Sequence, residues 1–384
     1  MTSLPPIHII GAGIGGLTLA RCFRNRGIHA VIFEKKPSPA YHNYGISLQP
    51  WAWRLLVKEC GIGEGDFRKR VAVDAVRGGR GKLGGKSVDE RVLRAHRGRL
   101  EGLLREGVDA EVRWGHVLQS ITLNGNGKGQ TLTFKDESDV KSAFVVDTSG
   151  VHSQVRKSLL PDLQLNVLPY VVFRGTRRIE MSVFKQIYEK CFGEGNIIQT
   201  KTGDILLQIW INDVKDESEG VDISIIYSRP SKDNDPLHRP GRDLNSSSDI
   251  SEAFFEEVSQ LKDLEQLFKD AFEDEKVRKG RTLHWLMRDV LVPKLELERL
   301  GKEGVVLIGD SAHALPILGG EGANFAIRDA VLLADSVKAA GEGGRGLDVD
   351  LDGFYGRVYR EWEDGIGMGE ERLREMHKGG KSSL

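Results

Sequence analysis

The sequence lacks the patterns that mark several classes of protein. Its three cysteines, Cys22, Cys60 and Cys191, are odd in number and far apart, so we expect neither a disulfide framework nor a zinc-ligand cluster. No apolar run reaches the roughly 18 residues of a membrane span, and the first residues show neither the basic nor the apolar part of a signal peptide. These absences predict a cytoplasmic chain in a reducing compartment, without an integral membrane segment or a metal site.

An excess of charge of one sign is lacking too. The chain has 55 Lys and Arg residues and 56 Asp and Glu residues, which gives a formal net charge of −1. Because nucleic acid and anionic membranes are bound through strong basic fields, neither is expected as a main partner. The length of 384 residues predicts two domains, at roughly 100–200 residues each.

Glycine, in contrast, is abundant, with 46 of 384 residues against a usual share of about 7%. Its first cluster, Gly11-Ala12-Gly13-Ile14-Gly15-Gly16, follows a short apolar run, 7–10, that predicts a buried strand. A helical pattern over 17–26 and a second strand, 30–33, come next, and Glu34 lies 21 residues after Gly13.

This is the G-x-G-x-x-G pattern in the strand, turn, helix and strand context that dinucleotide binding requires. Gly11 permits the tight turn, Gly13 lets a pyrophosphate approach the backbone, and Gly16 lets the helix pack closely against the strand. The helix N-terminus favours phosphate, and a carboxylate at Glu34 accepts hydrogen bonds from ribose hydroxyls. The pattern predicts a bound dinucleotide and leaves NAD and FAD open.

A second glycine cluster follows another predicted strand, 305–308. It reads Gly309-Asp310-Ser311-Ala312-His313-Ala314-Leu315-Pro316, then Gly319-Gly320-Glu321-Gly322-Ala323-Asn324, with a predicted helix over 325–336 after it. Together with the first cluster, this run resembles the two FAD-binding motifs of the class A flavin-dependent monooxygenases, the p-hydroxybenzoate-hydroxylase-like family, in its fungal secondary-metabolism type.

The resemblance implies an α/β fold in two interleaved domains. A Rossmann-like FAD-binding domain of the p-hydroxybenzoate-hydroxylase (GR2-type) fold would comprise residues 1–72, 97–165 and 280–340. A mixed-sheet substrate-binding domain would comprise residues 73–96 and 166–279, and residues 341–384 would form a C-terminal helix and tail. The domains must interleave because the two FAD motifs have to meet in space.

The resemblance also assigns residues to FAD. Asp310 would accept hydrogen bonds from ribityl hydroxyls, and the N–H groups at 322–324 would face the N1–C2=O edge of the flavin. Arg97 takes the place of an arginine that contacts FAD from the start of a helix. The expected FAD-binding residues are Gly11, Gly13, Ile14, Gly16, Glu34, Lys35, Gly45, Arg97, Asp310, Gly322, Ala323 and Asn324. The alternatives are an N-cap role for Asp310 and a solvated Arg97, and His313 is expected to be structural.

In one segment the chain departs from the family. Residues 145–156 match the family's G/A-D-G-x-x-S-x-x-R segment, except that Ser149 replaces the aspartate. Family members use that acid in organising FAD and NAD(P)H, whereas serine brings a hydrogen-bonding group without charge. Asp147, two residues earlier, is not expected to take its place.

The middle of the chain predicts the substrate domain. Strand-like runs recur from Tyr170 to Tyr227, and 251–279 has a helical pattern. Arg174 resembles an arginine that some fungal relatives place at the active site to orient a phenolate or enolate. The alternative is a strand arginine that faces solvent or pairs with a carboxylate. The tyrosine that such relatives carry some thirty residues later has no counterpart here, and Trp210 and Trp285 either line a pocket or pack in the core.

The implied function is that of an FAD-dependent monooxygenase. It would use NADPH or NADH and O2, through a flavin C4a-hydroperoxide, to hydroxylate or epoxidise an aromatic or polycyclic small molecule of secondary metabolism, with the protein positioning the substrate. One alternative is a non-hydroxylating flavoenzyme (oxidase, dehydrogenase or isomerase) whose NAD(P)H use is weakened because Ser149 replaces the usual Asp. Another is a non-enzymatic binding protein on the same scaffold.

Two further expectations concern the whole protein. We expect a monomer or a homodimer. The final Ser-Ser-Leu is similar to a peroxisomal address, and the alternative is a plain tail on a cytoplasmic protein.

Overall fold

The structure of the chain is a computed structural model that describes residues 5–77, 92–125, 129–193, 195–214, 219–242, 248–342 and 349–378. A parallel sheet brings together strands that lie far apart in the sequence. Its order is β17-β9-β1-β2-β5, and all four neighbouring pairs are parallel. The strands are β1 (Ile7–Ile10), β2 (Ala30–Glu34), β5 (Val112–Trp114), β9 (Val145–Asp147) and β17 (Val305–Leu307). Their apolar runs are buried because helices cover both faces of such a sheet.

The carboxyl ends of β1, β9 and β17 lie side by side in this sheet. The loops that leave them therefore start at one edge, where ligands of open α/β sheets bind. The helices that pack in the largest apolar core, around this sheet, include α1 (Ile14–Asn25), α2 (Pro50–Cys60), α3 (Glu64–Val71), α4 (Arg97–Arg105), α5 (Gln154–Leu159), α11 (Lys294–Lys302), α12 (Gly322–Glu342) and the first half of α13 (Leu351–His377).

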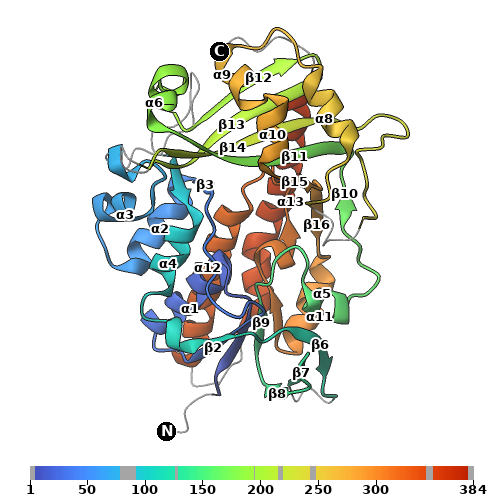
Figure 1. Ribbon diagram of the computed structural model, residues 1–384. Helices are drawn as coiled ribbons and strands as arrows, with labels where there is room; N and C mark the ends of the chain where they lie inside the picture. Colours follow the sequence, from blue (N-terminus) through green and yellow to red (C-terminus); the bar gives the residue numbers. More distant parts are fainter. Residues whose placement is uncertain are drawn as a thin grey trace.

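A second sheet is antiparallel and lies at the other end of the molecule (Figure 1). Its order is β12-β13-β14-β11-β15, from the strands β11 (Tyr170–Ile179), β12 (Ile197–Thr202), β13 (Ile205–Val214), β14 (Val221–Pro230) and β15 (Arg281–Trp285). A separate apolar core joins one face to the short helices α6 (Met181–Val183), α7 (Glu189–Phe192), α8 (Glu252–Ser259), α9 (Gln266–Ala271) and α10 (Asp274–Lys279). The other face is turned toward the parallel sheet and its helices (Figure 1).

Three small sheets and the long helix α13 complete the fold of the residues that the structure describes. β3 (Gly45–Leu48) pairs with β4 (Leu93–His96), and the other strands are β6 (Leu118–Leu123), β7 (Gln130–Phe134), β8 (Asp139–Ser142), β10 (Asn166–Val167), β16 (Arg288–Leu291) and β18 (His313–Ala314). Helix α13 (Leu351–His377) packs on α12 near its start, and at its end His377 shares a hydrogen bond of 2.7 Å with Ser228 of β14. It therefore bridges the two halves of the molecule.

The predicted α/β fold class is confirmed, and so are the strands that flank the two glycine clusters. The helical pattern over 251–279 is not one helix but three, α8 to α10, and Asp263 between α8 and α9 has a left-handed backbone with φ of 55°. The predicted domain boundaries stay a prediction. β15 belongs to the antiparallel sheet, so segment 280–340 contributes strands to both sheets.

No helix among the described residues is long and apolar enough to span a membrane. The C-terminal Ser-Ser-Leu lies outside the described residues.

Candidate cofactor and substrate site

The first glycine turn has the geometry that its pattern predicts. Gly11 has a left-handed φ of 103°, which side chains rarely adopt. A Cβ on Gly16 would lie 2.0 Å from the Gly11 carbonyl oxygen, so only glycine allows this contact of helix α1 with the turn. A Cβ on Gly13 would meet no atom of the described residues within 4 Å. The space above Gly13 is therefore open, as a pyrophosphate on the N-terminus of α1 requires.

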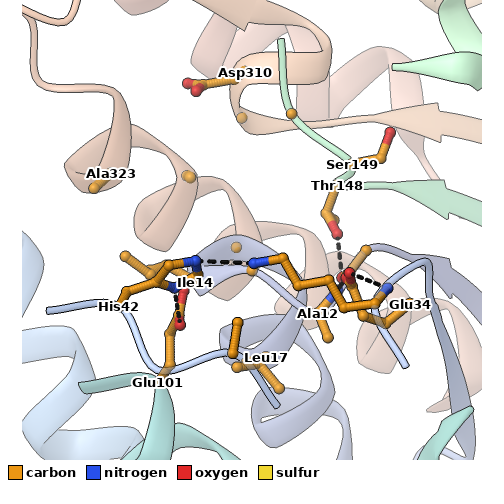
Figure 2. A pocket seen from close by; sticks show the side chains of 18 of the residues that line it. Ala12, Ile14, Leu17, Glu34, His42, Glu101, Thr148, Ser149, Asp310 and Ala323 are labelled. Carbon is orange, nitrogen blue, oxygen red and sulfur yellow. Dashed lines mark hydrogen bonds and ion pairs between the residues drawn. The ribbon is translucent and has the colours of Figure 1, made fainter. Parts of the chain in front are cut away.

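Glu34 closes the turn from the end of β2. One carboxylate oxygen accepts a hydrogen bond from the backbone N–H of Ala12 at 2.8 Å, and the other accepts one from the N–H of Lys36 at 3.0 Å (Figure 2). Thr148, which follows β9, donates from its hydroxyl to the carbonyl oxygens of Ile10 and Gly11, both at 2.9 Å. The loops after β1, β2 and β9 are thus bonded to one another.

A cavity of about 340 Å³ opens over these loops. Nine of the twelve residues expected to bind FAD line it: Gly11, Gly13, Ile14, Glu34, Lys35, Arg97, Asp310, Gly322 and Ala323. Figure 2 shows Asp310 and Ala323 across from the Ala12 turn, although they come from the other end of the chain.

The other three expected residues, Gly16, Gly45 and Asn324, do not line this cavity. Gly16 lies beneath the turn. The Asn324 amide is buried, accepts from the N–H of Gln49 at 2.8 Å and donates to the carbonyl of Ser47 at 3.2 Å, so it joins α12 to β3. Gly45 begins β3, where its N–H donates to the Asn212 side chain of the antiparallel sheet at 3.3 Å.

Asp310 is held in place by its own loop and by a buried arginine. A Cβ on Gly322 would lie 2.8 Å from the Asp310 carboxylate, so the Asp310 side chain lies close against the start of α12. Arg156 donates to the carbonyl oxygens of Ser311, at 2.6 Å, and of Asp310, at 3.4 Å. Burial raises the pKa of the Asp310 carboxyl, and the charges of Arg97 and Arg156 oppose that rise.

Ser149 lines the cavity where the family has an aspartate. Its hydroxyl donates to the Asp147 carboxylate at 2.5 Å and its N–H donates to the same oxygen at 3.0 Å. Asp147 also accepts a bond from Ser153, and it is buried below the loop, outside the cavity lining. Its acid therefore fixes the loop and does not replace the missing charge.

A chain of polar side chains along the cavity was not expected from the sequence. Lys36 donates to His42 at 2.9 Å, and His42 and Arg97 both bond the Glu101 carboxylate, at 2.7 and 2.8 Å. Arg97 also donates to the hydroxyl of Tyr44. Burial opposes ionisation of Glu101, but the bonds from His42 and Arg97 hold the pKa of its carboxyl below the usual range. The spacing of four residues between Arg97 and Glu101 on α4 was a readable signal, whereas His42 and Tyr44 lie in an irregular segment without one.

Comparisons with known proteins agree with this geometry. The FAD binding domain family matches residues 5–165 and 247–349. An FAD-dependent monooxygenase of Aspergillus niger, adaC, is 31% identical, and the match covers 97% of this chain and 94% of that protein. The FAD-dependent monooxygenase aptC of Emericella nidulans is 30% identical, with 97% and 95% covered. The chain belongs to the FAD-dependent monooxygenases.

Solved structures confirm the fold of this monooxygenase. CtdE in complex with FAD and a substrate superimposes with a TM-score of 0.71 at 16% identity and covers 97% of this chain and 89% of its own. The 2,6-dihydroxypyridine-3-hydroxylase of Arthrobacter nicotinovorans superimposes with a TM-score of 0.68 at 17% identity, with 100% and 98% covered. The cofactor of the monooxygenase is FAD, and the open Gly13 turn and the Asp310 loop fit it.

Arg174 lies on the antiparallel sheet of the monooxygenase, on the face turned toward the parallel sheet and its helices. It neither faces solvent nor pairs with a carboxylate of the described residues, since it is buried and donates to the Ser224 hydroxyl at 3.0 Å. Its guanidinium lies 4.9 Å from the centre of the Tyr44 ring and 5.3 Å from that of Trp285. Burial lowers the pKa of Arg174 to about 10. The ring of Tyr44 thus lies beside Arg174, while the Tyr44 hydroxyl bonds Arg97.

His313 is structural, as predicted. It is buried, bonds Asp329 at 2.6 Å and stacks on Trp362, with ring centres 4.1 Å apart. Trp210 and Trp285 are partly buried against a small apolar cluster between the sheet and α13, and each also faces an arginine.

Proposed function

We propose that this monooxygenase uses NADPH or NADH and O2 to hydroxylate or epoxidise an aromatic or polycyclic small molecule of secondary metabolism. The observation that carries the proposal is the double contact of Tyr44. Its hydroxyl bonds Arg97 in the cofactor cavity, and its ring lies against Arg174 on the antiparallel sheet. The cofactor cavity and the cationic face of the sheet are thus adjacent.

The residues around the cavity would hold FAD in a fixed position. The open N-terminus of α1 at Gly13 would take the pyrophosphate, and Glu34 the ribose hydroxyls. Asp310 would accept bonds from the ribityl chain, and the first turn of α12 would place its N–H groups and positive dipole end at the flavin ring. When bound and reduced, FAD supplies the activation of O2 and the transfer of one oxygen atom.

The antiparallel sheet would position the substrate. The Arg174 guanidinium would stabilise an ionised hydroxyl or enolate oxygen of an aromatic ligand, which makes the ring carbon next to it more electron-rich. Tyr44, Trp285 and the apolar side chains of the same face would exclude water from that ring. The protein's part is thus binding, orientation and exclusion of water.

The test measures oxygen incorporation rather than cofactor consumption alone. The FAD-loaded enzyme is mixed with NADPH or NADH and a panel of hydroxylated naphthalenes and anthraquinones under ¹⁸O₂. We expect one labelled oxygen atom in the product of at least one ring system. NAD(P)H oxidation that yields only hydrogen peroxide for every ring system would contradict the proposal.

The second candidate, a non-hydroxylating flavoenzyme, is favoured by Ser149. Anaerobic stopped-flow absorbance separates the two. A monooxygenase is expected to be reduced by NAD(P)H, faster with substrate present. Reduction by the organic substrate itself, and none by NADPH or NADH, would instead indicate a dehydrogenase or an oxidase.

A further inference from the structure

A second buried arginine faces the same surface as Arg174. Arg94 lies on β4 and is only 3% exposed. Its guanidinium donates to the Ser47 hydroxyl at 3.1 Å, makes a long contact of 3.5 Å with the carbonyl of Ile211, and lies 5.1 Å from the centre of the Trp210 ring. Its Nη2 atom is buried and has no hydrogen-bond partner among the residues that the structure describes.

Arg94 and Arg174, which we call the arginine pair, have no carboxylate partner among the described residues. The carboxylates at the near ends of β13 and β14 serve other cations: Asp213 bonds Arg99 and Asp222 bonds Arg178, both at 2.8 Å. Burial, with the positive charge of Arg174, lowers the pKa of Arg94 to about 9, so both groups remain cations at neutral pH. Two buried charges without a counter-charge are strongly unfavourable in a protein alone.

Other donors on this surface lack acceptors as well. Nη2 of Arg174 and Nε1 of Trp210 are buried and, like Nη2 of Arg94, have no hydrogen-bond partner in the described part of the chain. These atoms share one face of the sheet, because Trp210 pairs in register with Ser224, and Ser224 accepts the bond from Arg174. A surface with three orphaned donors and two cations is suited to an acceptor with negative charge.

We propose that Arg94 is a second substrate-binding residue, and that the arginine pair selects an aromatic ligand that carries two neighbouring acidic oxygens, such as an aryl carboxylate with an ortho hydroxyl group. The inference rests on the proposed function, which it deepens by assigning a charge and a substituent pattern to the substrate. A carboxylate fits a guanidinium through two parallel hydrogen bonds. The second oxygen would lie at the other arginine, with the ligand ring against Trp210 and Trp285.

The alternative is that Arg94 has a purely structural role and connects β4 to β3 and β13 through its hydrogen bonds. The two roles predict opposite effects of removing Arg94 on the stability of the ligand-free protein. Removing a structural arginine lowers stability, whereas removing a buried and unpaired charge leaves the stability of the ligand-free protein unchanged or raises it. Arg94→Met keeps the aliphatic stem and the packing on Trp210, and therefore tests that difference.

The experiment measures binding to the FAD-loaded protein without NAD(P)H. The probes are 1-hydroxy-2-naphthoate and its neutral methyl ester, followed by isothermal titration calorimetry and by quenching of tryptophan fluorescence. We expect the acid to bind more tightly than the ester. In Arg94→Met the affinity for the acid should fall roughly ten- to hundredfold, as for a lost hydrogen bond to a charged group, while the affinity for the ester stays constant.

A matched control lies on the same strand as Arg174. Arg178 has a side chain that is 55% exposed and bonded to Asp222, so Arg178→Gln should keep the preference for the acid. If Arg94→Met does not fold, Arg94→Lys decides in its place: a selective loss of affinity for the acid supports the proposal, and unchanged affinity overturns it.

Several results would overturn the arginine pair as a selector. They are equal affinity of wild type for acid and ester, no binding of either, or a loss of Tm in Arg94→Met without a selective loss of the acid. The proposed function fails in a different way. If the acid is selected but no labelled oxygen reaches any product, the arginine pair stands and the monooxygenation of these ring systems does not.

Discussion

Two glycines of one turn differ in what their missing side chains would meet. A Cβ on Gly16 would lie 2.0 Å from the carbonyl oxygen of Gly11, whereas a Cβ on Gly13 would meet nothing within 4 Å. Gly16→Ala is therefore expected to displace α1 and to destabilise the apoprotein by several kcal/mol. Gly13→Ala should leave its stability unchanged or raise it by about 0.4–1 kcal/mol, since φ of −80° suits alanine.

The two variants separate folding from FAD binding. Thermal unfolding of the apoprotein reports the first, and the absorbance ratio at about 450 to 280 nm of the purified holoprotein reports bound FAD. Gly13→Ala should fold and bind FAD weakly, because the new methyl group occupies the space that the pyrophosphate needs. If Gly13→Ala retained its full FAD content, the pyrophosphate would have to bind at a position other than Gly13.

Ser149 offers a test of the departure from the family. Its hydroxyl lies 2.5 Å from the buried Asp147 carboxylate, so Ser149→Asp would place two acids side by side. The pKa of one of them must then rise by roughly 1–3 units. Such a group stabilises the fold at low pH and loses this contribution as pH rises. We expect Ser149→Asp to lower Tm, more at about pH 8 than at about pH 5.

Ser149→Asn is the matched control, because it has the same size and no charge. Its Tm difference from wild type should not depend on pH in that window. If Ser149→Asp were as stable as wild type at high pH, Asp147 would have to be free to turn away, and the three hydrogen bonds that it accepts from Ser149 and Ser153 would not define its position.

At the scale of elements, local sequence patterns were sufficient to predict the structure where a motif lies within one short segment. The strand 7–10, the glycine turn and the strand ending on Glu34 lie close together in the sequence, and Glu34 bonds Ala12 within that segment. Tyr44 and Arg94 show the limit. Tyr44 meets Arg174 across 130 residues of chain, and the arginine pair exists only because β3 and β4 lie against β13. No spacing in the sequence reports such a contact.

Helix α13 makes a prediction of its own, because its last turns cover the antiparallel sheet. Leu373 is fully buried in the cluster with Val172 and Ile226 of that sheet, whereas its neighbour Arg374 is exposed. Leu373→Ala should cost about 2–5 kcal/mol of stability. We expect Tm to fall without a change in the FAD content of the folded protein, since the FAD cavity is lined by other elements.

Arg374→Ala controls for a change at the same helix end, and its Tm should stay within the error of wild type. A loss of FAD from folded Leu373→Ala protein would show that α13 also controls the parallel-sheet half of the molecule.

At the scale of the whole molecule, the two sheets interleave along the chain, so each sheet contains segments that lie far apart in the sequence. The parallel sheet takes strands from residues 7 to 307, and the antiparallel sheet takes its edge strand β15 from the segment that precedes the Asp310 loop. The two sheets cannot fold as separate stretches of chain. A buried group in one sheet should therefore report on the unfolding of the entire protein.

His284 is such a group, and its protonation is expected to lower the stability of the fold at acidic pH. Its ring is fully buried on β15 against Phe173, and neither ring nitrogen has a hydrogen-bond partner among the described residues. Burial, together with the charges of Arg242, Arg239, His238 and Arg288, lowers the pKa of His284 to about 3. The folded protein therefore keeps this histidine neutral at a pH where the unfolded chain binds a proton.

This difference in protonation determines how the stability of the fold changes with pH. Because the folded pKa lies below the unfolded value of about 6.5, the stability contribution is complete above pH 6.5 and is lost as pH falls toward 3. Between about pH 7 and pH 5 the loss for one such histidine is about 2 kcal/mol. Urea titrations at these two pH values measure the free energy of unfolding. Between pH 7 and pH 5, this free energy should fall by about 2 kcal/mol less in His284→Leu than in wild type. His29 is exposed, and in the control variant His29→Leu the free energy of unfolding should fall as much as in wild type. Equal losses in wild type and His284→Leu would mean that His284 takes up its proton inside the folded protein, and that the cations around it do not hold it neutral.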